Sequence, residues 1–304
     1  MLFLRSTGLL DYPMKSKLWL LLFCLLLGSI AESQPFVDIV NLKAEYFPGP
    51  RYSGTAADSL STRFYDANLL LPFKQKNDGY ILVSGEWSML DFKYDSETPM
   101  ETKLYSIRAA AGYEGPLKNP KWKVLALALP KINSDLKANT TDEFQMGGFL
   151  LFKYQKTDSL HWHFGLYYNS ELFGAYFMPI IGIEYKMSDR WQLFGDMPAN
   201  LNLEYKLGKK TYCGLEYQSV ISTYRLESGN YVREGKNFWG YDQFKVYFNY
   251  YISKYFTWYV EGGTTFGREY KVYDKDDNLV PGVLFGQNLD GAVVNTGVAL
   301  RIRE

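Results

Sequence analysis

Cysteine is nearly absent from this sequence. Only two occur among 304 residues, and one of them, Cys24, lies in an apolar N-terminal segment. Because that segment has the features of an export signal, Cys213 is the one cysteine expected in the mature chain. A single thiol cannot form an intramolecular disulfide, so the sequence excludes a small secreted domain held together by disulfides.

A net charge and long apolar runs are absent as well. The 33 basic residues balance the 33 acidic residues, and without a basic excess we expect no nucleic-acid partner. Beyond the N-terminal segment, the sequence has no run of the roughly 20 apolar residues that a membrane-spanning helix needs. The mature chain is therefore not expected to cross a membrane with helices.

The N-terminal segment itself predicts export. Residues 14–17, Met-Lys-Ser-Lys, form a basic n-region, residues 18–27 form an apolar core, and the small residues Ala31 and Ser33 precede Gln34. This order is that of a secretory signal peptide cleaved just before Gln34. The alternative, a membrane anchor, is disfavoured because the apolar core is too short to span a bilayer.

Aromatic residues and strict alternation are what the mature chain has in abundance. Tyrosine, phenylalanine and tryptophan number 26, 20 and 7, which is 17% of the chain. In FKVYFNYY, residues 244–251, one side chain in two is apolar and faces one way, as in a strand with two different faces. The same pattern recurs at 101–114, 161–169, 256–262 and 294–303.

Two fold classes share this alternation, a soluble β-sandwich and a membrane barrel. The apolar faces here begin or end with aromatic residues, such as Trp162 and Tyr168, as in the aromatic girdles of a membrane barrel. The opposite faces carry charges, which a sandwich core would not accept and a polar lumen does. The sequence therefore predicts an all-β fold, a transmembrane antiparallel up-and-down β-barrel.

The predicted domains are an N-terminal extension and signal peptide over residues 1–33 and an outer-membrane β-barrel over residues 34–304. The connections between strands alternate in length, as periplasmic turns and extracellular loops do. The short ones are expected at 75–79, 114–120, 156–159, 188–189, 208–210 and 253–254. The longer ones are expected at 48–62, 94–102, 133–143, 171–175, 226–239 and 271–290.

The number of strands depends on the segment between two of the short connections, 188–189 and 208–210. Both lie on the same side of the membrane, so the chain must reverse between them. Met-Pro-Ala-Asn at 197–200 is the turn-like sequence available there. This predicts short strands at 190–197 and 200–207 and a total of fourteen. If the proline only kinks one long strand, the total is twelve.

The polar faces supply the candidate lumen-lining residues: Arg108, His161, His163, Glu184, Lys186, Glu204, Lys206, Glu216, Lys245, Glu261 and Arg301. Their opposite charges suit an ion-pair network that fills a narrow barrel, or a constriction that selects solutes in an open pore. The two histidines lie about 7 Å apart on one strand face. The spacing suggests no third ligand, so we predict no metal and no other cofactor.

An outer-membrane lipid hydrolase needs a nucleophile beside a histidine. Ser159 and Ser170 are the candidates, but the sequence has no G-x-S-x-G motif. We therefore predict a protein that is not an enzyme.

One region resembles a known family. The segment from Pro179 to Lys209 is similar to an uncharacterised family of outer-membrane β-barrels found in Bacteroidota and related bacteria, a domain of unknown function. The residues that carry the resemblance are Pro179, Gly182, Glu184, Tyr185, Ser188, Asp189, Arg190, Trp191, Leu193, Pro198, Leu201, Glu204, Tyr205, Leu207 and Lys209. The resemblance implies an outer-membrane barrel and no catalytic residue.

The function expected from these features is that of a channel or porin-like transporter for small solutes in the outer membrane of a Gram-negative bacterium. The alternative is a closed barrel with a structural or binding role through its extracellular loops. A lipid-modifying enzyme is the least supported class. The expected partners are membrane lipid, lipopolysaccharide and the outer-membrane assembly machinery.

Overall fold

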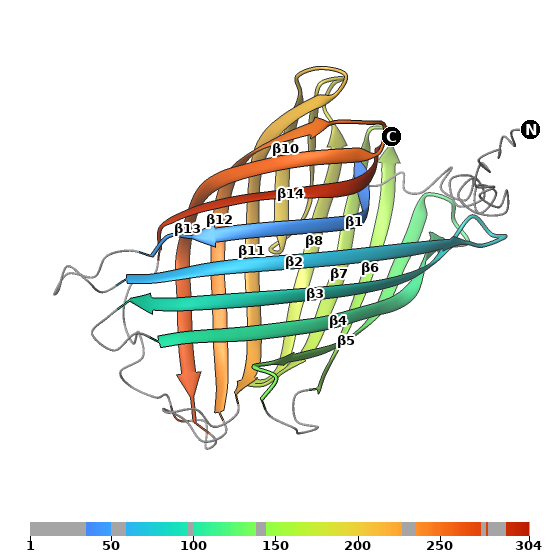
Figure 1. The fold of residues 1–304 in the computed structure, drawn as a ribbon. Coiled ribbons are helices and arrows are strands. Elements are labelled where there is room, and N and C mark those ends of the chain that lie inside the picture. Colours follow the sequence, from blue (N-terminus) through green and yellow to red (C-terminus); the bar gives the residue numbers. More distant parts are fainter. Residues whose placement is uncertain are drawn as a thin grey trace, which may run out of the picture.

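A computed structural model gives the fold, and it describes residues 35–49, 59–95, 100–137, 144–226, 235–274, 278 and 290–303. The predicted signal peptide and N-terminal extension lie outside the described residues. Fourteen strands form one antiparallel sheet that closes on itself (Figure 1). Within the described part of the chain, no helix is long and apolar enough to cross a membrane. The predicted antiparallel β-barrel is confirmed.

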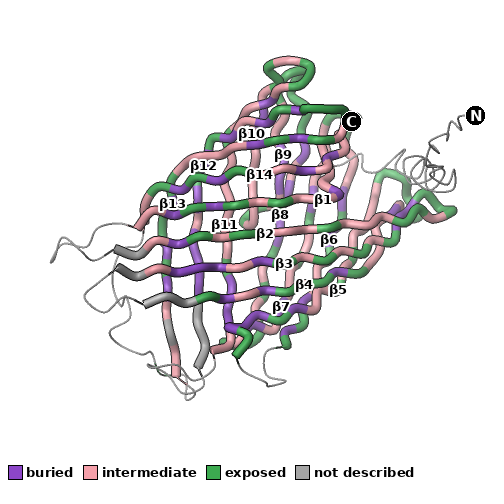
Figure 2. Tube along the Cα trace, in the orientation of Figure 1, coloured by how far each residue is buried: buried purple, intermediate pink, exposed green. Residues whose placement is uncertain are grey.

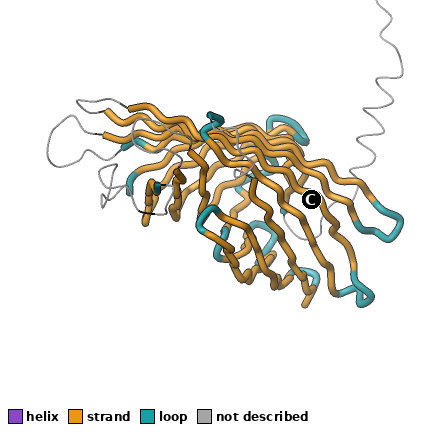
Figure 3. The backbone as a smooth tube through the Cα atoms, turned by 90° about the horizontal axis from the view of Figure 1, so that it is seen from below, coloured by secondary structure: helices purple, strands orange, loops and turns teal. Residues whose placement is uncertain are grey.

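The strands follow one another around the barrel in chain order, and β1 pairs with β14 to close it. Figure 3 shows strands making up almost all of the described tube. Their bounds are β1 Phe36–Phe47, β2 Ser59–Lys74, β3 Tyr80–Asp95, β4 Met100–Pro116, β5 Trp122–Ser134, β6 Phe144–Thr157, β7 Leu160–Glu171, β8 Gly174–Lys186, β9 Trp191–Met197, β10 Asn200–Lys206, β11 Thr211–Leu226, β12 Gly235–Tyr251, β13 Phe256–Tyr273 and β14 Ala292–Arg303.

The alternation in the sequence becomes an inside and an outside. On β12, Phe244 and Val246 are 56% and 60% exposed, whereas Lys245 between them is 4% exposed. Figure 2 shows more buried and more exposed residues following one another along many of the other strands. Because successive side chains of a strand point to opposite faces, the apolar residues cover the outside and the charged residues fill the inside. A closed barrel with this apolar outer surface spans a membrane.

The segment between residues 188 and 210 is two strands, as predicted. β9 and β10 form a hairpin that turns at Pro198 and Ala199, where a proline costs no ladder hydrogen bond. The count of fourteen is therefore confirmed and the alternative of twelve is wrong. One longer connection was also expected over 171–175, but β7 and β8 are joined by only Leu172 and Phe173.

The β9–β10 hairpin is short enough to leave part of the barrel wall incomplete. Both strands have 7 residues, whereas the others have between 12 and 18. β8 pairs with β9 only over residues 181–186, and β11 pairs with β10 only over residues 212–218. Residues 174–180 of β8 and 219–226 of β11 continue past the hairpin, with no strand between them among the described residues.

The outward position of Val246 can be tested by placing a charge there. We expect Val246→Arg to destabilise the barrel by about 2–4 kcal/mol, because hydrocarbon does not solvate a guanidinium group. Urea unfolding in lipid vesicles measures the loss. Tyr250→Arg is the matched control, on the same face of β12 but close to a turn, and should cost only about 0–1 kcal/mol. Equal losses in the two variants would contradict a lipid-facing outer surface.

Candidate functional site

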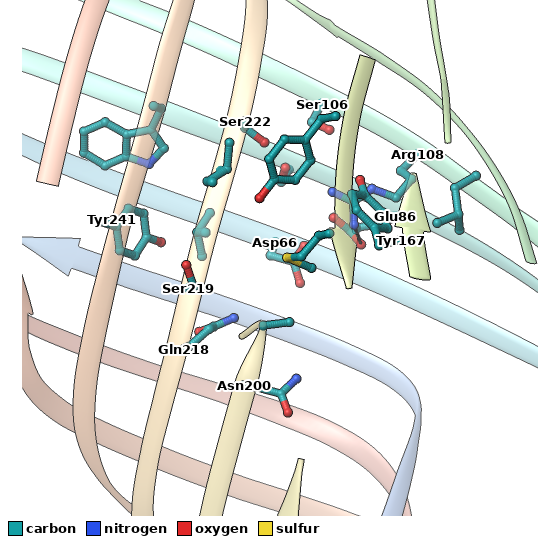
Figure 4. A pocket seen from close by; sticks show the side chains of 18 of the residues that line it. Asp66, Glu86, Ser106, Arg108, Tyr167, Asn200, Gln218, Ser219, Ser222 and Tyr241 are labelled. Atoms are coloured by element: carbon teal, nitrogen blue, oxygen red, sulfur yellow. Dashed lines mark hydrogen bonds and ion pairs between the residues drawn. The ribbon is translucent and has the colours of Figure 1, made fainter. Parts of the chain in front are cut away.

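The candidate site is a chamber of about 570 Å³ inside the barrel (Figure 4). Its charged lining residues come from several strands: Lys43 of β1, Asp66 of β2, Glu86 of β3, Arg108 of β4, Glu171 of β7 and Asp196 of β9. Arg108 Nη1 lies 3.3 Å from Glu86 Oε2 and donates a hydrogen bond to it. No hydrogen bond or ion pair joins the Asp66 carboxylate to another described residue, so this group faces the chamber unpaired.

The chamber has a second, apolar side. It is formed by Leu127 and Leu129 of β5, Phe149 of β6, and Met178 and Ile180 of β8. A cavity of a few hundred Å³ with an apolar lining and a few polar groups is typical of a small-molecule site. With charges on one side and apolar groups on the other, the chamber suits an amphipathic molecule.

Toward the ends of the strands that bear the long connections, aromatic rings close the lumen. Phe92 of β3 meets Trp239 of β12 with ring centroids 5.2 Å apart, although four strands separate β3 from β12 around the barrel. Phe47, Tyr241 and Tyr270 complete the cluster, with centroid distances of 4.9 to 6.4 Å. We call these five residues the loop-end closure.

Toward the short turns, a different set of contacts crosses the lumen. Phe36 of β1 and Phe194 of β9 lie with ring centroids 5.9 Å apart. Arg303 of β14 forms an ion pair with Glu204 of β10, and its guanidinium lies 3.6 Å from the ring centroid of Tyr212. We call these five residues the turn-end closure. The chamber lies between the two closures.

Several predicted lumen residues come together in ion pairs within the barrel wall. The Lys245 Nζ lies 3.1 Å from Glu216 and 2.5 Å from Glu261 on the two adjacent strands. Arg301 donates two hydrogen bonds to Asp38, at 2.6 and 2.9 Å. A charge in a low-dielectric interior needs such a partner, which accounts for the pairing.

The two predicted histidines share a carboxylate. Glu184 lies 3.1 Å from His163 Nε2 and 3.6 Å from His161 Nδ1. His163 Nδ1 lies 2.7 Å from Asp196 on β9. Within the described residues, no group of three or more histidine, cysteine or acidic side chains is arranged to hold a metal ion.

Two predicted lumen residues lie apart from these clusters. Lys186 and Lys206 are exposed at the turn ends of β8 and β10. Lys186 lies 3.8 Å from Asp189 in the following turn. The nearby glutamates Glu184 and Glu204 are instead paired with residues of other strands, His163 and Arg303.

The sequence interpretation missed some residues of the site. Asp66 faces inward on β2 by the same alternation that identified the predicted lumen residues. The alternation could therefore have identified Asp66 as well. Arg303 likewise shares the inward face of Arg301. Phe92 and Trp239 gave no such signal, because residue 239 was expected to end a long connection and the aromatic residues at strand ends were interpreted as a feature of membrane girdles.

The candidate nucleophiles are not placed for catalysis. Ser170 lies on the outer face of β7, where its hydroxyl accepts a hydrogen bond from the Met146 amide at 2.7 Å. Ser159 lies in a turn with its hydroxyl oxygen 3.3 Å from that of Thr157. Within the described residues, neither serine is hydrogen-bonded to a histidine.

Comparison with known families identifies the chain. A family model described as a domain of unknown function, DUF6268, matches residues 29–278. The chain belongs to the DUF6268 family. This family has no stated function, in keeping with the uncharacterised family that the segment after Pro179 resembles. No curated protein matches this DUF6268 chain.

Solved outer-membrane channels are similar to the DUF6268 chain in fold. The COG4313 channel from Pseudomonas putida F1 aligns with a TM-score of 0.46 and 7% identity, over 90% of this chain and 100% of that one. A deltaS2S3 mutant of the TodX monoaromatic hydrocarbon channel gives 0.43 and 11%, over 90% and 91%. The NanC porin gives 0.39 and 10%, over 86% and 98%. Likeness at this level concerns the barrel alone and carries no function.

The double pairing of Lys245 predicts a large loss of stability when this residue is replaced. Lys245→Met should destabilise the DUF6268 barrel by about 3–5 kcal/mol, because two inward carboxylates then lose their shared cation. Adding Glu261→Gln should recover part of the loss. Lys186→Met, which removes an exposed lysine, is the control and should change stability by less than about 0.5 kcal/mol. Urea unfolding in vesicles measures all three, and equal stability of Lys245→Met and wild type would contradict the pairing.

Proposed function

We propose that this protein is a channel for small molecules in the outer membrane of a Gram-negative bacterium of the Bacteroidota type. The observation that carries the proposal is the chamber between the two closures, with Asp66, Glu86 and Arg108 facing into it. A barrel whose role is only structural has no need of an unpaired carboxylate in an internal cavity, because an unpaired charge inside a protein is costly.

Because the two closures cross the lumen, the proposed channel is selective and is not a permanently open pore. Solute that moves along the axis must displace the Phe92–Trp239 contact at one end and the Phe36–Phe194 contact at the other. Each aromatic pair contributes only about 0.5–1.5 kcal/mol beyond its buried area. Barriers of this kind yield to side-chain rotation, so the closures act as gates and leave the barrel wall intact.

The same closures favour a second candidate, a closed barrel with a structural or binding role. In that case the lumen contacts serve stability alone and no solute passes. An enzyme is not proposed, because in the described part of the chain neither Ser159 nor Ser170 is hydrogen-bonded to a histidine.

Membrane lipid, lipopolysaccharide and the outer-membrane assembly machinery are the proposed partners. Arg63 and Lys103 are exposed and flank Asp91 on neighbouring strands near the long connections. The proposed orientation puts these connections outside the cell, where the two cations can contact the phosphates of lipopolysaccharide.

Removing both closures separates the two candidates. We expect wild-type protein in planar bilayers to give small, rare conductance steps. Phe92→Ala with Trp239→Ala should raise the conductance, and adding Phe36→Ala and Arg303→Ala should raise it further. The full variant should conduct at least about tenfold more than wild type, since each 1.4 kcal/mol removed from a barrier gives about tenfold in rate.

Phe244→Ala, which removes an outward aromatic residue, is the control and should leave the conductance unchanged. Retained resistance to unfolding in sodium dodecyl sulfate without heating shows that the barrel is intact. A folded full variant with wild-type conductance would contradict the channel and support the closed barrel.

A further inference from the structure

We infer that the barrel has a side window between β8 and β11, through which amphipathic amines pass between the lipid and the chamber. The inference rests on the chamber that underlies the proposed function, and it adds a route and a class of ligand. It comes from the short β9–β10 hairpin and from the residues that line the chamber.

The window is bounded on all four sides by the described chain. Its two sides are residues 174–180 of β8 and residues 219–222 of β11, which run past the hairpin. Its floor is the hairpin turn, where the Ser219 amide donates a hydrogen bond of 2.9 Å to the Ala199 carbonyl.

At the end nearer the long connections, the window is closed by contacts between β11 and the end of β7. The Thr223 hydroxyl donates a hydrogen bond of 2.5 Å to Glu171 Oε2 and accepts one of 3.2 Å from the Leu172 amide. Just above, the Asp135 amide donates to the Arg225 carbonyl at 3.1 Å. These contacts restore a continuous wall above the opening.

The lining of the chamber shows that it reaches through this opening. Four consecutive residues of β11, 219–222, line the chamber. In a strand with neighbours on both edges, only alternate side chains can reach one side of the sheet. Ile221 points outward and is 39% exposed, between the inward Val220 and Ser222. The chamber therefore passes around the free edge of β11 to the outer surface.

The outer rim of the window is apolar. Phe177 and Ile181 of β8 point outward and are 59% and 61% exposed, and Ile221 flanks the other side. Such side chains face hydrocarbon in a membrane barrel. The window therefore opens toward lipid, and a molecule that enters here must first partition into the bilayer.

The chemistry behind the window selects the head group of the ligand. Met178, Ile180 and Val220 line the way in, and the unpaired carboxylate of Asp66 lies within the same chamber. A carboxylate that faces a cavity without a partner is best satisfied by a charged hydrogen-bond donor. The two cations of the lining already have carboxylate partners, since Lys43 Nζ lies 3.6 Å from Glu45 Oε2 and Arg108 is hydrogen-bonded to Glu86. An amine on an apolar chain therefore meets both requirements, whereas an alkyl carboxylate of equal length is repelled by Asp66.

The first experiment tests the opening. In a Cys213→Ser background, bimane is attached at Val220→Cys or at Leu129→Cys, and the protein is placed in bilayers containing mid-chain nitroxide lipid. Both sites face the chamber, but β4 and β6 flank Leu129. We expect several-fold stronger lipid quenching at position 220 than at 129. Equal quenching at the two sites overturns the window.

The second experiment tests the ligand and the route. Dodecylamine should change the fluorescence of bimane at position 129, and Asp66→Asn should weaken its apparent affinity by about tenfold. Dodecanoate is the control and should have no effect. Joining Met178→Cys to Val220→Cys with a bismaleimide should slow dodecylamine binding relative to the same double-cysteine variant without the cross-link.

The outcomes separate the window from the channel. If dodecylamine binds at the same rate after cross-linking, the window is wrong and the channel stands. If dodecanoate binds as well as dodecylamine, or Asp66→Asn has no effect, the assigned ligand class is wrong. If the variant without closures does not conduct, the axial channel fails, and the quenching result still decides the window.

Discussion

Backbone N–H and C=O groups in a bilayer must be hydrogen-bonded within the protein, because hydrocarbon offers no partner. The closed sheet, with β1 on β14, meets this constraint around nearly the whole wall. The exception is the pair of edges at 174–180 and 219–222. Irregular or unpaired backbone is tolerated at membrane depth where it borders a cavity, and the chamber lies against these edges.

Closure of the sheet also sends every second side chain into a narrow interior, and the rest of the structure follows from how those side chains are satisfied. Lys245, His163 and Arg301 pair with carboxylates, so ion pairs line the inner surface of the barrel wall. Aromatic rings meet across the lumen near the long connections, and Phe36 meets Phe194 near the turns. The chamber is the space that neither set of contacts fills.

Local sequence patterns were enough to predict the number of strands and the inward face of most of them. Alternation placed Lys245 and Glu261 inward, and parity at Pro198 gave fourteen strands. Pairing across adjacent strands, as between Glu216 and Lys245, is implied once the strands are known. Tyr270 could not be placed in this way. A bulge on β13, with Gly267 at a φ of 63°, reverses the alternation and turns Tyr270 inward.

The sequence by itself determined the closed barrel and the inward face of most strands, because alternation and turn residues are local properties. It also determined the short hairpin, through the proline at 198. Only the tertiary structure decided that Phe92 meets Trp239 and that Glu204 meets Arg303, because contacts across a lumen depend on strand tilt and bulges. For the same reason, only the tertiary structure shows the opening between β8 and β11, because it depends on how far both strands extend past the hairpin.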